Sequence, residues 1–235
     1  LRYLGAQVDT CIPDRIKDGY GLHEQLIDQA AEDGIDTIVT CDNGIAAAAE
    51  IQMAKDKGMT VIITDHHEVP YREEKGERQM VLPPADAILN PKQYDCPYPN
   101  KNLCGAVVAF KYIAALYERF GVPEEDLEDY YELAAIATVG DVMDLQGENR
   151  ILVKEGLYRL KNTKNKGLQE LIRANSLEDA KITAYHIGFV LGPCINASGR
   201  LDTAARSLAL LNAKTKEEAA RLAGDLTALN QSRKA

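Results

Sequence analysis

The sequence predicts an α/β fold in which a parallel sheet is flanked by helices, with a mostly helical C-terminal half. Three observations predict it. Short runs rich in β-branched residues occur at 37–41 and 60–64. The stretch 45–57 between them is rich in alanine and has good helix propensity. A strand, a helix and a strand in this order form a right-handed βαβ unit with parallel strands. From residue 123 onward the pattern is helical.

Further elements are expected around this unit. Residues 6–13 are predicted to form a strand, and 22–32 an amphipathic helix that Gly34 closes in a positive-φ conformation. Residues 87–91 are predicted to resume the sheet and to end at a proline, which cannot donate to a strand ladder. The charged connector 68–79 is predicted to be mobile surface.

The remaining elements are predicted to be helices, at 105–120, 127–139, 151–161, 168–174, 182–191 and from 215 to the end. Asn102 is available as an N-cap for the first of them. Thr215 and Glu218 have the spacing of a capping box. The stretch 192–200 is predicted to be a loop because it contains glycine and proline between helical patterns.

Three parts are expected along the chain. Residues 1–125 would form the α/β part, 126–213 a helical part of the same domain, and 214–235 the start of a helix that connects to a further C-terminal domain. The chain begins at Leu1 in globular-looking sequence, so we interpret it as a segment of a longer protein.

Composition excludes several classes of protein. The net charge of −9 argues against a generally basic nucleic-acid surface, although a local one remains compatible with it. No apolar stretch approaches the length of a membrane span, so no membrane association is expected. The five cysteines show no C-x-x-C spacing, which indicates neither structural zinc nor a disulfide framework and favours a reducing, cytoplasmic location.

Polar side chains follow both β-branched runs. Asp42 comes directly after the first, and Asp65, His66 and His67 come directly after the second. The carboxyl ends of parallel strands meet at one edge of a sheet, and ligands of open α/β sheets bind outside that edge. A carboxylate with imidazoles suits Mn²⁺, Fe²⁺ or Zn²⁺ better than Ca²⁺ or Mg²⁺. The alternative is a surface turn that carries two solvated histidines.

Two further stretches could take part in a site. Asp141 follows an apolar run, where a carboxylate is costly unless it is paired or bound to a metal, so it joins the metal candidates, with Asp144 as a less favoured rival. The stretch 192–200 mixes amide, hydroxyl, glycine and guanidinium groups, which can hold a phosphate. A plain turn between helices is the simpler interpretation of that stretch.

Four motifs, taken in order, resemble the DHH phosphoesterase superfamily and, within it, the branch of single-strand-specific 5′ to 3′ exonucleases. They are Cys41-Asp42-Asn43-Gly44-Ile45, Asp65-His66-His67, Thr138-Val139-Gly140-Asp141-Val142 and Pro193-x-Ile195-Asn196-Ala197-Ser198-Gly199-Arg200. The resemblance implies phosphodiester hydrolysis of single-stranded DNA in recombination and repair. It also implies two bound ions, normally Mn²⁺ or Mg²⁺, that clamp the attacking and leaving oxygens.

The resemblance also implies a role for each site residue. Asp42, His66 and Asp141 would be metal ligands. His67 would contact the scissile phosphate or assist the leaving group, and Asp65 would orient a histidine. The residues that would engage phosphates of the bound strand are Asn196, Ser198, Gly199 and Arg200. Single-strand-binding protein or a helicase would be partners of such an enzyme.

The chain departs from the family pattern in three ways. The family's first motif, a run of alternating aspartates, and its C-terminal domains are absent, so we expect this segment alone to bind metal weakly and to hydrolyse little. Cys194 stands where many relatives carry an arginine, and one phosphate contact would be lost. Two alternatives stay open. One is another DHH enzyme, such as a nanoRNase, a cyclic-dinucleotide phosphodiesterase or a manganese pyrophosphatase, and the other is a catalytically inactive scaffold module.

Overall fold

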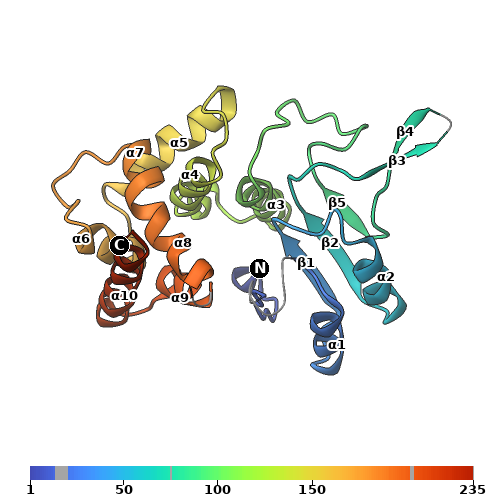
Figure 1. Ribbon diagram of the computed structural model, residues 1–235, viewed down its shortest axis with the longest axis horizontal. Helices are drawn as coiled ribbons and strands as arrows, with labels where there is room; N and C mark the ends of the chain where they lie inside the picture. Colours follow the sequence, from blue (N-terminus) through green and yellow to red (C-terminus); the bar gives the residue numbers. More distant parts are fainter. Residues whose placement is uncertain (14–20, 75, 202–203, 235) are drawn as a thin grey trace. The chain divides into compact units, whose positions relative to one another are not determined.

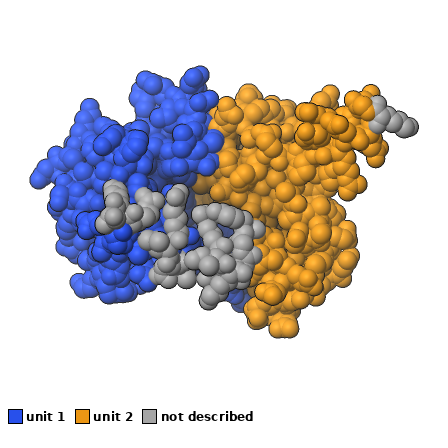
Figure 2. Space-filling view, viewed as in Figure 1, with its two compact units in different colours: residues 1–19, 123–235 blue, residues 20–122 orange. Residues whose placement is uncertain are grey.

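A computed structural model describes residues 1–13, 21–74, 76–201 and 204–234. The chain divides into two compact units, drawn in different colours in Figure 2. The sheet unit consists of residues 20–122, and the helical unit consists of residues 1–19 and 123–235. Among the helices that the structure describes, none combines the length and the apolar character needed to cross a membrane. The predicted limits at 125 and 213 stay a prediction.

The sheet unit is built on three parallel strands, β1 (Thr37–Cys41), β2 (Thr60–Thr64) and β5 (Ala87–Leu89), in the order β1-β2-β5 (Figure 1). β1 and β2 are paired over their whole length, because Thr37 pairs with Thr60 and Cys41 pairs with Thr64. Both strands therefore end at the same edge. The predicted parallel sheet flanked by helices is confirmed.

Helices α1 (Glu24–Glu32) and α2 (Ala48–Asp56) pack on this sheet. Their shared apolar cluster contains six fully or nearly fully buried residues, Ile27, Ile51, Ala54, Met59, Val61 and Ile63. Val61 and Ile63 are two residues apart, so they point to the same face of β2. Gly34 adopts the predicted positive φ, at 72°.

Helix α3 (Gly105–Phe120) also contacts β1 and β2, and it covers the predicted range. The predicted cap is wrong, because the N-cap position falls on Cys104 and no side chain caps the helix there. Asn102 lies two residues before that position, too early to reach the helix as its N-cap residue.

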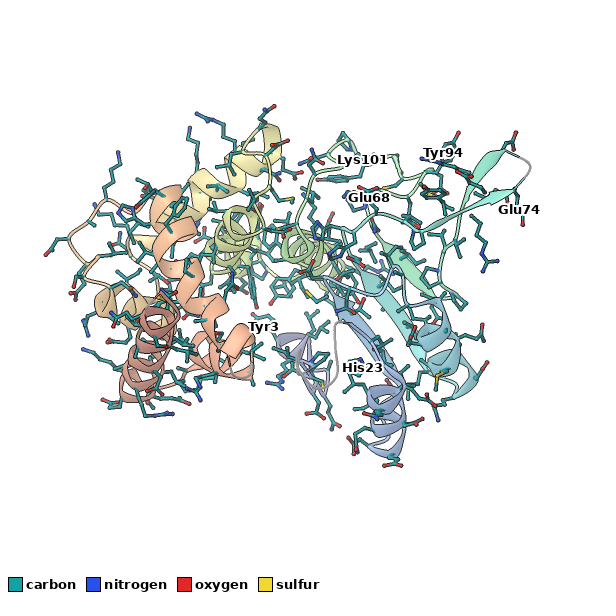
Figure 3. The ribbon with its side chains drawn as sticks, in the orientation of Figure 1. Tyr3, His23, Glu68, Glu74, Tyr94 and Lys101 are labelled. Atoms are coloured by element: carbon teal, nitrogen blue, oxygen red, sulfur yellow. The ribbon has the colours of Figure 1, made fainter. Side chains whose placement is uncertain are left out.

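The connector predicted at 68–79 is mostly surface, as expected, but it contains regular structure. Strands β3 (Tyr71–Glu74) and β4 (Glu77–Met80) form an antiparallel hairpin, and Figure 3 shows Glu74 at its tip, away from the sheet. Every residue of these two strands is exposed. The guanidinium of Arg78 lies 4.4 Å from the centre of the Tyr71 ring across the hairpin. Ladder hydrogen bonds and this cation–π contact hold a strand pair that has no apolar alternation.

The predicted strand at 6–13 is also wrong. These residues pair with no strand that the structure describes, and they belong to the helical unit. A strand needs a neighbour with which to exchange backbone hydrogen bonds. Here the carbonyl of Val8 instead accepts a hydrogen bond at 3.0 Å from Nε of Arg2, which starts a short 3₁₀ helix, Arg2–Leu4.

The helical unit contains α4 to α10, together with a second 3₁₀ turn and one π-helical turn. Their bounds are Glu124–Leu127 (3₁₀), Tyr130–Gly140 (α4), Gly147–Leu160 (α5), Lys166–Ala174 (α6), Ala184–His186 (α7), Ile187–Leu191 (π), Gly192–Leu201 (α8), Ala205–Asn212 (α9) and Lys216–Lys234 (α10). Their apolar cluster includes Leu168, Leu171, Ile187 and Leu226. α10 contacts α6, α8 and α9.

The start of α10 contains half of the predicted capping box. The backbone N–H of Glu218 donates to Oγ1 of Thr215 at 3.2 Å, as expected of an N-cap threonine. The carboxylate of Glu218 accepts from the N–H of Lys214 rather than from that of Thr215.

The predicted loop at 192–200 is wrong, because α8 continues directly from the π turn. In an α-helix the ring of Pro193 would meet the carbonyl four residues earlier. The π turn ends just before Pro193 and changes the hydrogen-bond register there, with the N–H of Gly192 donating to the carbonyl of Ile187. A Cβ on Gly192 would lie 2.7 Å from that carbonyl oxygen, so the turn needs glycine at this position.

Candidate metal centre

The ends of β1 and β2 place two aspartates at one edge of the sheet. The N–H of Asp42 donates to the carbonyl of Thr64 at 2.9 Å, and the N–H of Asp65 donates to the carbonyl of Leu89 at 3.0 Å. Each ladder therefore continues for one residue past its strand. The chain turns away immediately afterwards, which leaves the side chains that follow at the edge.

The turn after β1 has a conformation that the sequence specifies closely. Asp42 has a φ of 64°, in the left-handed region that aspartate tolerates better than most residues. Oγ1 of Thr40 donates to the carbonyl of Asn43 at 2.7 Å, and Gly44 follows with a φ of 109°. A Cβ on Gly44 would lie 2.9 Å from that same Oγ1. The turn therefore needs glycine at position 44, and its left-handed residue before that is an aspartate, which tolerates this conformation.

The carboxylate of Asp42 lies against the first residue of α3. A Cβ on Gly105 would lie 2.2 Å from Oδ1 of Asp42 and 2.6 Å from its Cγ. Such distances are far inside van der Waals contact. Gly105 therefore leaves the space that the carboxylate occupies.

Oδ1 of Asp42 lies 3.0 Å from Nε2 of His66. The imidazole of His66 is buried, whereas the carboxylate of Asp42 is about half exposed, with a relative side-chain exposure of 56%. One ligand atom each from Asp42, His66 and His67 lies within 4.8 Å of the others. A carboxylate oxygen and two imidazole nitrogens fit a divalent transition metal such as Mn²⁺.

Asp65 lies behind the two histidines. It is buried, and its carboxylate accepts hydrogen bonds from the N–H groups of Ile45, His66 and His67 at 3.0, 2.8 and 3.2 Å. Burial raises the pKa of this carboxyl, but these hydrogen bonds and the one with the His67 ring outweigh it and hold the pKa below its ordinary value. Asp65 is therefore an ionised acceptor that faces the protein.

The imidazole of His67 is held by Asp65 and is exposed on its other side. Nδ1 of His67 lies 2.7 Å from Oδ1 of Asp65. A carboxylate can only accept, so this contact assigns the proton of the neutral ring to Nδ1. Nε2 then remains for a ligand or a substrate. The ring centres of His66 and His67 are 4.6 Å apart.

Asn90 is a site residue that sequence reasoning missed. It is buried directly after β5, its Nδ2 donates to the carbonyl of His67 at 2.9 Å, and its Oδ1 accepts from the N–H of Lys92 at 2.8 Å. It thereby fixes the backbone of the histidine pair. The available signal was its position, because it ends the third strand at the edge where Asp42 and Asp65 lie.

Asp141 belongs to the helical unit, where it forms the C-cap of α4. It is exposed, and its N–H donates to the carbonyl of Ala137 at 2.8 Å. A carboxylate at a helix C-terminus is disfavoured by the negative end of the helix dipole, so a cation would stabilise it there. Asp144 is exposed as well, and its carbonyl accepts from the side chain of Asn149 at 3.0 Å.

The expected phosphate-binding residues all fall on α8. Asn196 is exposed and Gly199 is half-buried, whereas Ser198 is buried, with its Oγ 2.7 Å from Oγ of Ser207. The Ser198 hydroxyl is thus used within the helical unit, which does not suit a phosphate contact. The side chain of Arg200 lies outside the part of the chain that the structure describes.

Cys194 is buried, and its Sγ lies 3.5 Å from Nδ2 of Asn230 and 3.7 Å from Oδ1 of Asn175. This side chain therefore faces α10 and the end of α6. In this chain, position 194 is part of the packing of the helical unit.

The fold and the Asp-His-His constellation define an α/β domain with a metal-type site at a sheet edge. The chain belongs to the DHH family, whose N-terminal domain matches residues 1–138.

Within that family, the chain is similar to proteins named single-stranded-DNA-specific exonuclease RecJ. It is 42% identical to the protein of Bacillus subtilis (strain 168) over 233 residues, covering 99% of this chain and 28% of that protein. It is 39% identical to the protein of Escherichia coli (strain K12) over 245 residues, covering 100% of this chain and 41% of that protein. The chain therefore spans less than half the length of these curated relatives.

Solved structures agree with the sequence relatives. The crystal structure of exonuclease RecJ bound to manganese matches with a TM-score of 0.86 and 35% identity, over 99% of this chain and 56% of that one. RecJ of Thermus thermophilus in complex with Mn²⁺ matches with a TM-score of 0.75 and 35% identity, over 89% of this chain and 30% of that one. The resemblance predicted from the motifs is confirmed.

Proposed function

We propose that this chain is part of a metal-dependent nuclease that hydrolyses phosphodiester bonds of single-stranded DNA, releasing nucleotides from the 5′ end. The observation that carries this proposal is the convergence of Asp42, His66 and His67, with ligand atoms within 4.8 Å of each other, at one sheet edge. The similarity to single-stranded-DNA-specific exonucleases supports the choice of substrate. From the family resemblance, we also propose a function in DNA recombination and repair.

Asp42 and His66 would hold the metal, and we propose Asp141 as a further ligand. Mn²⁺ or Mg²⁺, two ions in the complete enzyme, would supply positive charge to the phosphoryl oxygens and acidify a water molecule. RecJ structures with Mn²⁺ and with Mg²⁺ support both choices. The imidazole of His66 beside the carboxylate of Asp42 favours Mn²⁺.

Two residues of the chain, Asp65 and His67, would then supply a proton to the oxygen that leaves the phosphorus. Asp65 receives four hydrogen bonds and stays ionised, so it stabilises the protonated imidazole of His67 through Nδ1. Nε2 of His67 would donate to the leaving oxygen as that P–O bond breaks. Asp65 acts through His67 in this proposal, as its positioning residue.

On α8, we propose Asn196, Gly199 and Arg200 as contacts to phosphates of the bound strand. The exposed amide of Asn196 supports this role. All five cysteines are free, which supports a reducing location such as the cytoplasm. Single-strand-binding protein and helicase partners stay a prediction.

The test uses the full-length gene product with Mn²⁺ and single-stranded DNA labelled at either the 5′ or the 3′ end. We expect early release of 5′ label as mononucleotides, and we expect His66→Ala to abolish it. His23→Gln is the control, because it removes an imidazole of the same unit outside the metal centre.

Release of 3′ label first would contradict the direction of digestion. Intact DNA together with cleavage of pyrophosphate or dinucleotides would identify another DHH enzyme. If none of these substrates is cleaved, the catalytically inactive scaffold replaces the nuclease as the proposed function.

A further inference from the structure

The helix that runs from α7 through the π turn into α8 presents an unusual set of side chains to solvent. The structure describes all of residues 184–199, and three of them are exposed, namely Tyr185, Phe189 and Asn196. The two aromatic side chains have relative exposures of 64% and 65%. Asn196 follows Phe189 by seven residues on the continuous helix. We call these three residues the aromatic stripe.

The rings of Tyr185 and Phe189 are stacked on each other. Their centres are 5.0 Å apart and their planes meet at 28°. The ring of His186 packs edge-on against Tyr185 at 5.8 Å. His186 is itself held at Nδ1 by the backbone N–H of Thr183 at 3.1 Å, next to the Thr183 hydroxyl at 3.0 Å. The exposed pair therefore has a defined orientation before any partner binds.

The opposite side of the same helix is anchored in the core. Ile187 and Leu191, at the two ends of the π turn, are both fully buried. A backbone anchored by these two buried residues would reduce the conformational entropy that Tyr185 and Phe189 lose on binding. π turns within α-helices occur frequently at functional sites.

The chemistry of the aromatic stripe fits an unstacked nucleobase. Every base has a π face that can stack on an exposed aromatic ring, whatever the sequence. An exposed amide further along the same helix can hydrogen-bond to a base edge or to a phosphate oxygen. The stripe carries no aliphatic side chain among its exposed residues, and it carries no carboxylate that would repel a nucleic acid.

We propose that Tyr185 and Phe189 form a stacking platform for the bases of a bound single strand, on the same helix as the proposed phosphate contact of Asn196. This inference rests on the proposed function and adds a subsite to it. It assigns the exposed rings to base contacts, which are separate from the phosphate contacts of α8.

The first test uses the absence of tryptophan from the chain. In the full-length gene product, Phe189→Trp places an indole on the stripe, and Tyr158→Trp, at an exposed site on α5, is the matched control. Binding is measured without divalent metal, in EDTA, so that the DNA stays intact. We expect an oligothymidylate of about 12 nucleotides, within the range of single-strand site sizes, to quench the indole emission of Phe189→Trp. Any tryptophan beyond the present chain is replaced by phenylalanine first.

The second test separates bases from phosphates. Tyr185→Ala with Phe189→Ala should weaken binding of the oligothymidylate roughly ten- to hundredfold, as expected for lost base stacking. Binding of an abasic oligomer with the same phosphates should stay unchanged. Tyr185→Phe should retain the wild-type affinity, and Tyr158→Ala, which removes an exposed tyrosine of α5, is the control.

The outcomes distinguish the two proposals. If DNA is bound and degraded but the indole is not quenched, or if both oligomers are weakened equally, the platform is wrong and the nuclease proposal stands. If the indole of Phe189→Trp is already shielded without DNA, the stripe is covered by another copy or by further chain, which also overturns the platform. If the wild type binds neither oligomer but degrades DNA with Mn²⁺, the platform alone fails. If it binds neither oligomer and degrades no DNA with Mn²⁺, the proposed function fails and the platform fails with it.

Discussion

At the scale of single residues, the candidate metal centre depends on side chains that are small or turned inward as much as on the proposed ligands. Asp42, Asp65 and the two histidines could be predicted because each follows a recognisable strand. Gly105 and Asn90 could not be predicted, because each acts through a contact with a residue far along the chain. A Cβ on Gly105 would lie 2.2 Å from Oδ1 of Asp42, and Nδ2 of Asn90 lies 2.9 Å from the carbonyl of His67. Ser198 shows the same limit, since a motif does not reveal which side of a helix faces the core.

Gly105→Ala should weaken metal binding. The added methyl group would occupy the position of the Asp42 carboxylate, and loss of support for a ligand typically lowers affinity roughly ten- to hundredfold. Mn²⁺ titration calorimetry on the full-length gene product measures this. Gly224→Ala, where a Cβ meets nothing within 4 Å, should leave the affinity unchanged. Unchanged affinity in Gly105→Ala would show that Asp42 binds no metal in this orientation.

Glu132→Gln should make the protein more stable at neutral pH. Glu132 is buried on α4, and burial raises the pKa of its carboxyl, which the hydrogen bond from Thr163 at 2.6 Å offsets only in part. A carboxyl whose pKa is higher in the folded than in the unfolded state contributes its stability at pH values below the ordinary pKa of 4.5. That contribution is lost as the pH rises through the folded-state pKa.

Urea unfolding of wild type and Glu132→Gln across about pH 4 to 8, a range that starts near the ordinary glutamate pKa, measures this difference. The advantage of the variant should grow as pH rises and then level off. Glu118→Gln, an exposed glutamate of α3, should differ little from wild type over the same range. A variant that is less stable than wild type at neutral pH would show that Glu132 is stabilised as a carboxylate.

At the scale of elements, the regular parts followed their sequence patterns and the irregular parts did not. β1, β2 and α3 have the predicted ranges, because apolar periodicity and turn residues determine them locally. The β3–β4 hairpin has no such pattern, and α8 contains glycine and proline that ordinarily mark a turn. The hairpin and α8 both depend on which backbone groups pair with one another, and the pattern of apolar and polar residues does not reveal that pairing.

The packing of α4 on α5 allows a sharp test at this scale. A Cβ on Gly156 would lie 2.3 Å from Cβ of Ala135 and 2.4 Å from the carbonyl oxygen of Tyr131. Gly156→Ala should therefore push the two helices apart and lower the free energy of unfolding by about 1–3 kcal/mol. Urea denaturation measures this loss. Gly224→Ala is the control, because Gly224 also lies in a helix but has room for a methyl group. Equal stability of the two variants would contradict the close packing.

At the scale of the whole molecule, the division into units was only partly visible in the sequence. The change from strand to helix patterns near residue 123 agrees with the start of the longer segment of the helical unit. The membership of residues 1–19 in that unit could not be predicted. It involves contacts such as the hydrogen bond from the Tyr3 hydroxyl to the Asp126 carboxylate at 2.8 Å, which joins positions 123 residues apart.

Metal should stabilise the sheet unit, because Asp42 and His66 both belong to it. A ligand at about a hundred times its Kd stabilises a folded state by about 2.7 kcal/mol. Differential scanning calorimetry on the full-length gene product should therefore show a higher unfolding temperature with MnCl₂ than without it. His66→Ala should abolish this increase in unfolding temperature, and His23→Gln should retain it. A shift that survives in His66→Ala would place the bound metal elsewhere.

The π turn at Ile187–Leu191 has a consequence for sequence change within the family. It holds one residue more than an α-helical turn, so a deletion there would restore the α-helical register. Because the wider turn takes up the extra residue, the deletion would change the angle between Tyr185 and Asn196 around the axis only slightly. It would instead bring the ring of Pro193 against the carbonyl four residues earlier and bend the helix between the aromatic pair and Asn196. Loss of that single residue would therefore be more disruptive to the aromatic stripe than most substitutions.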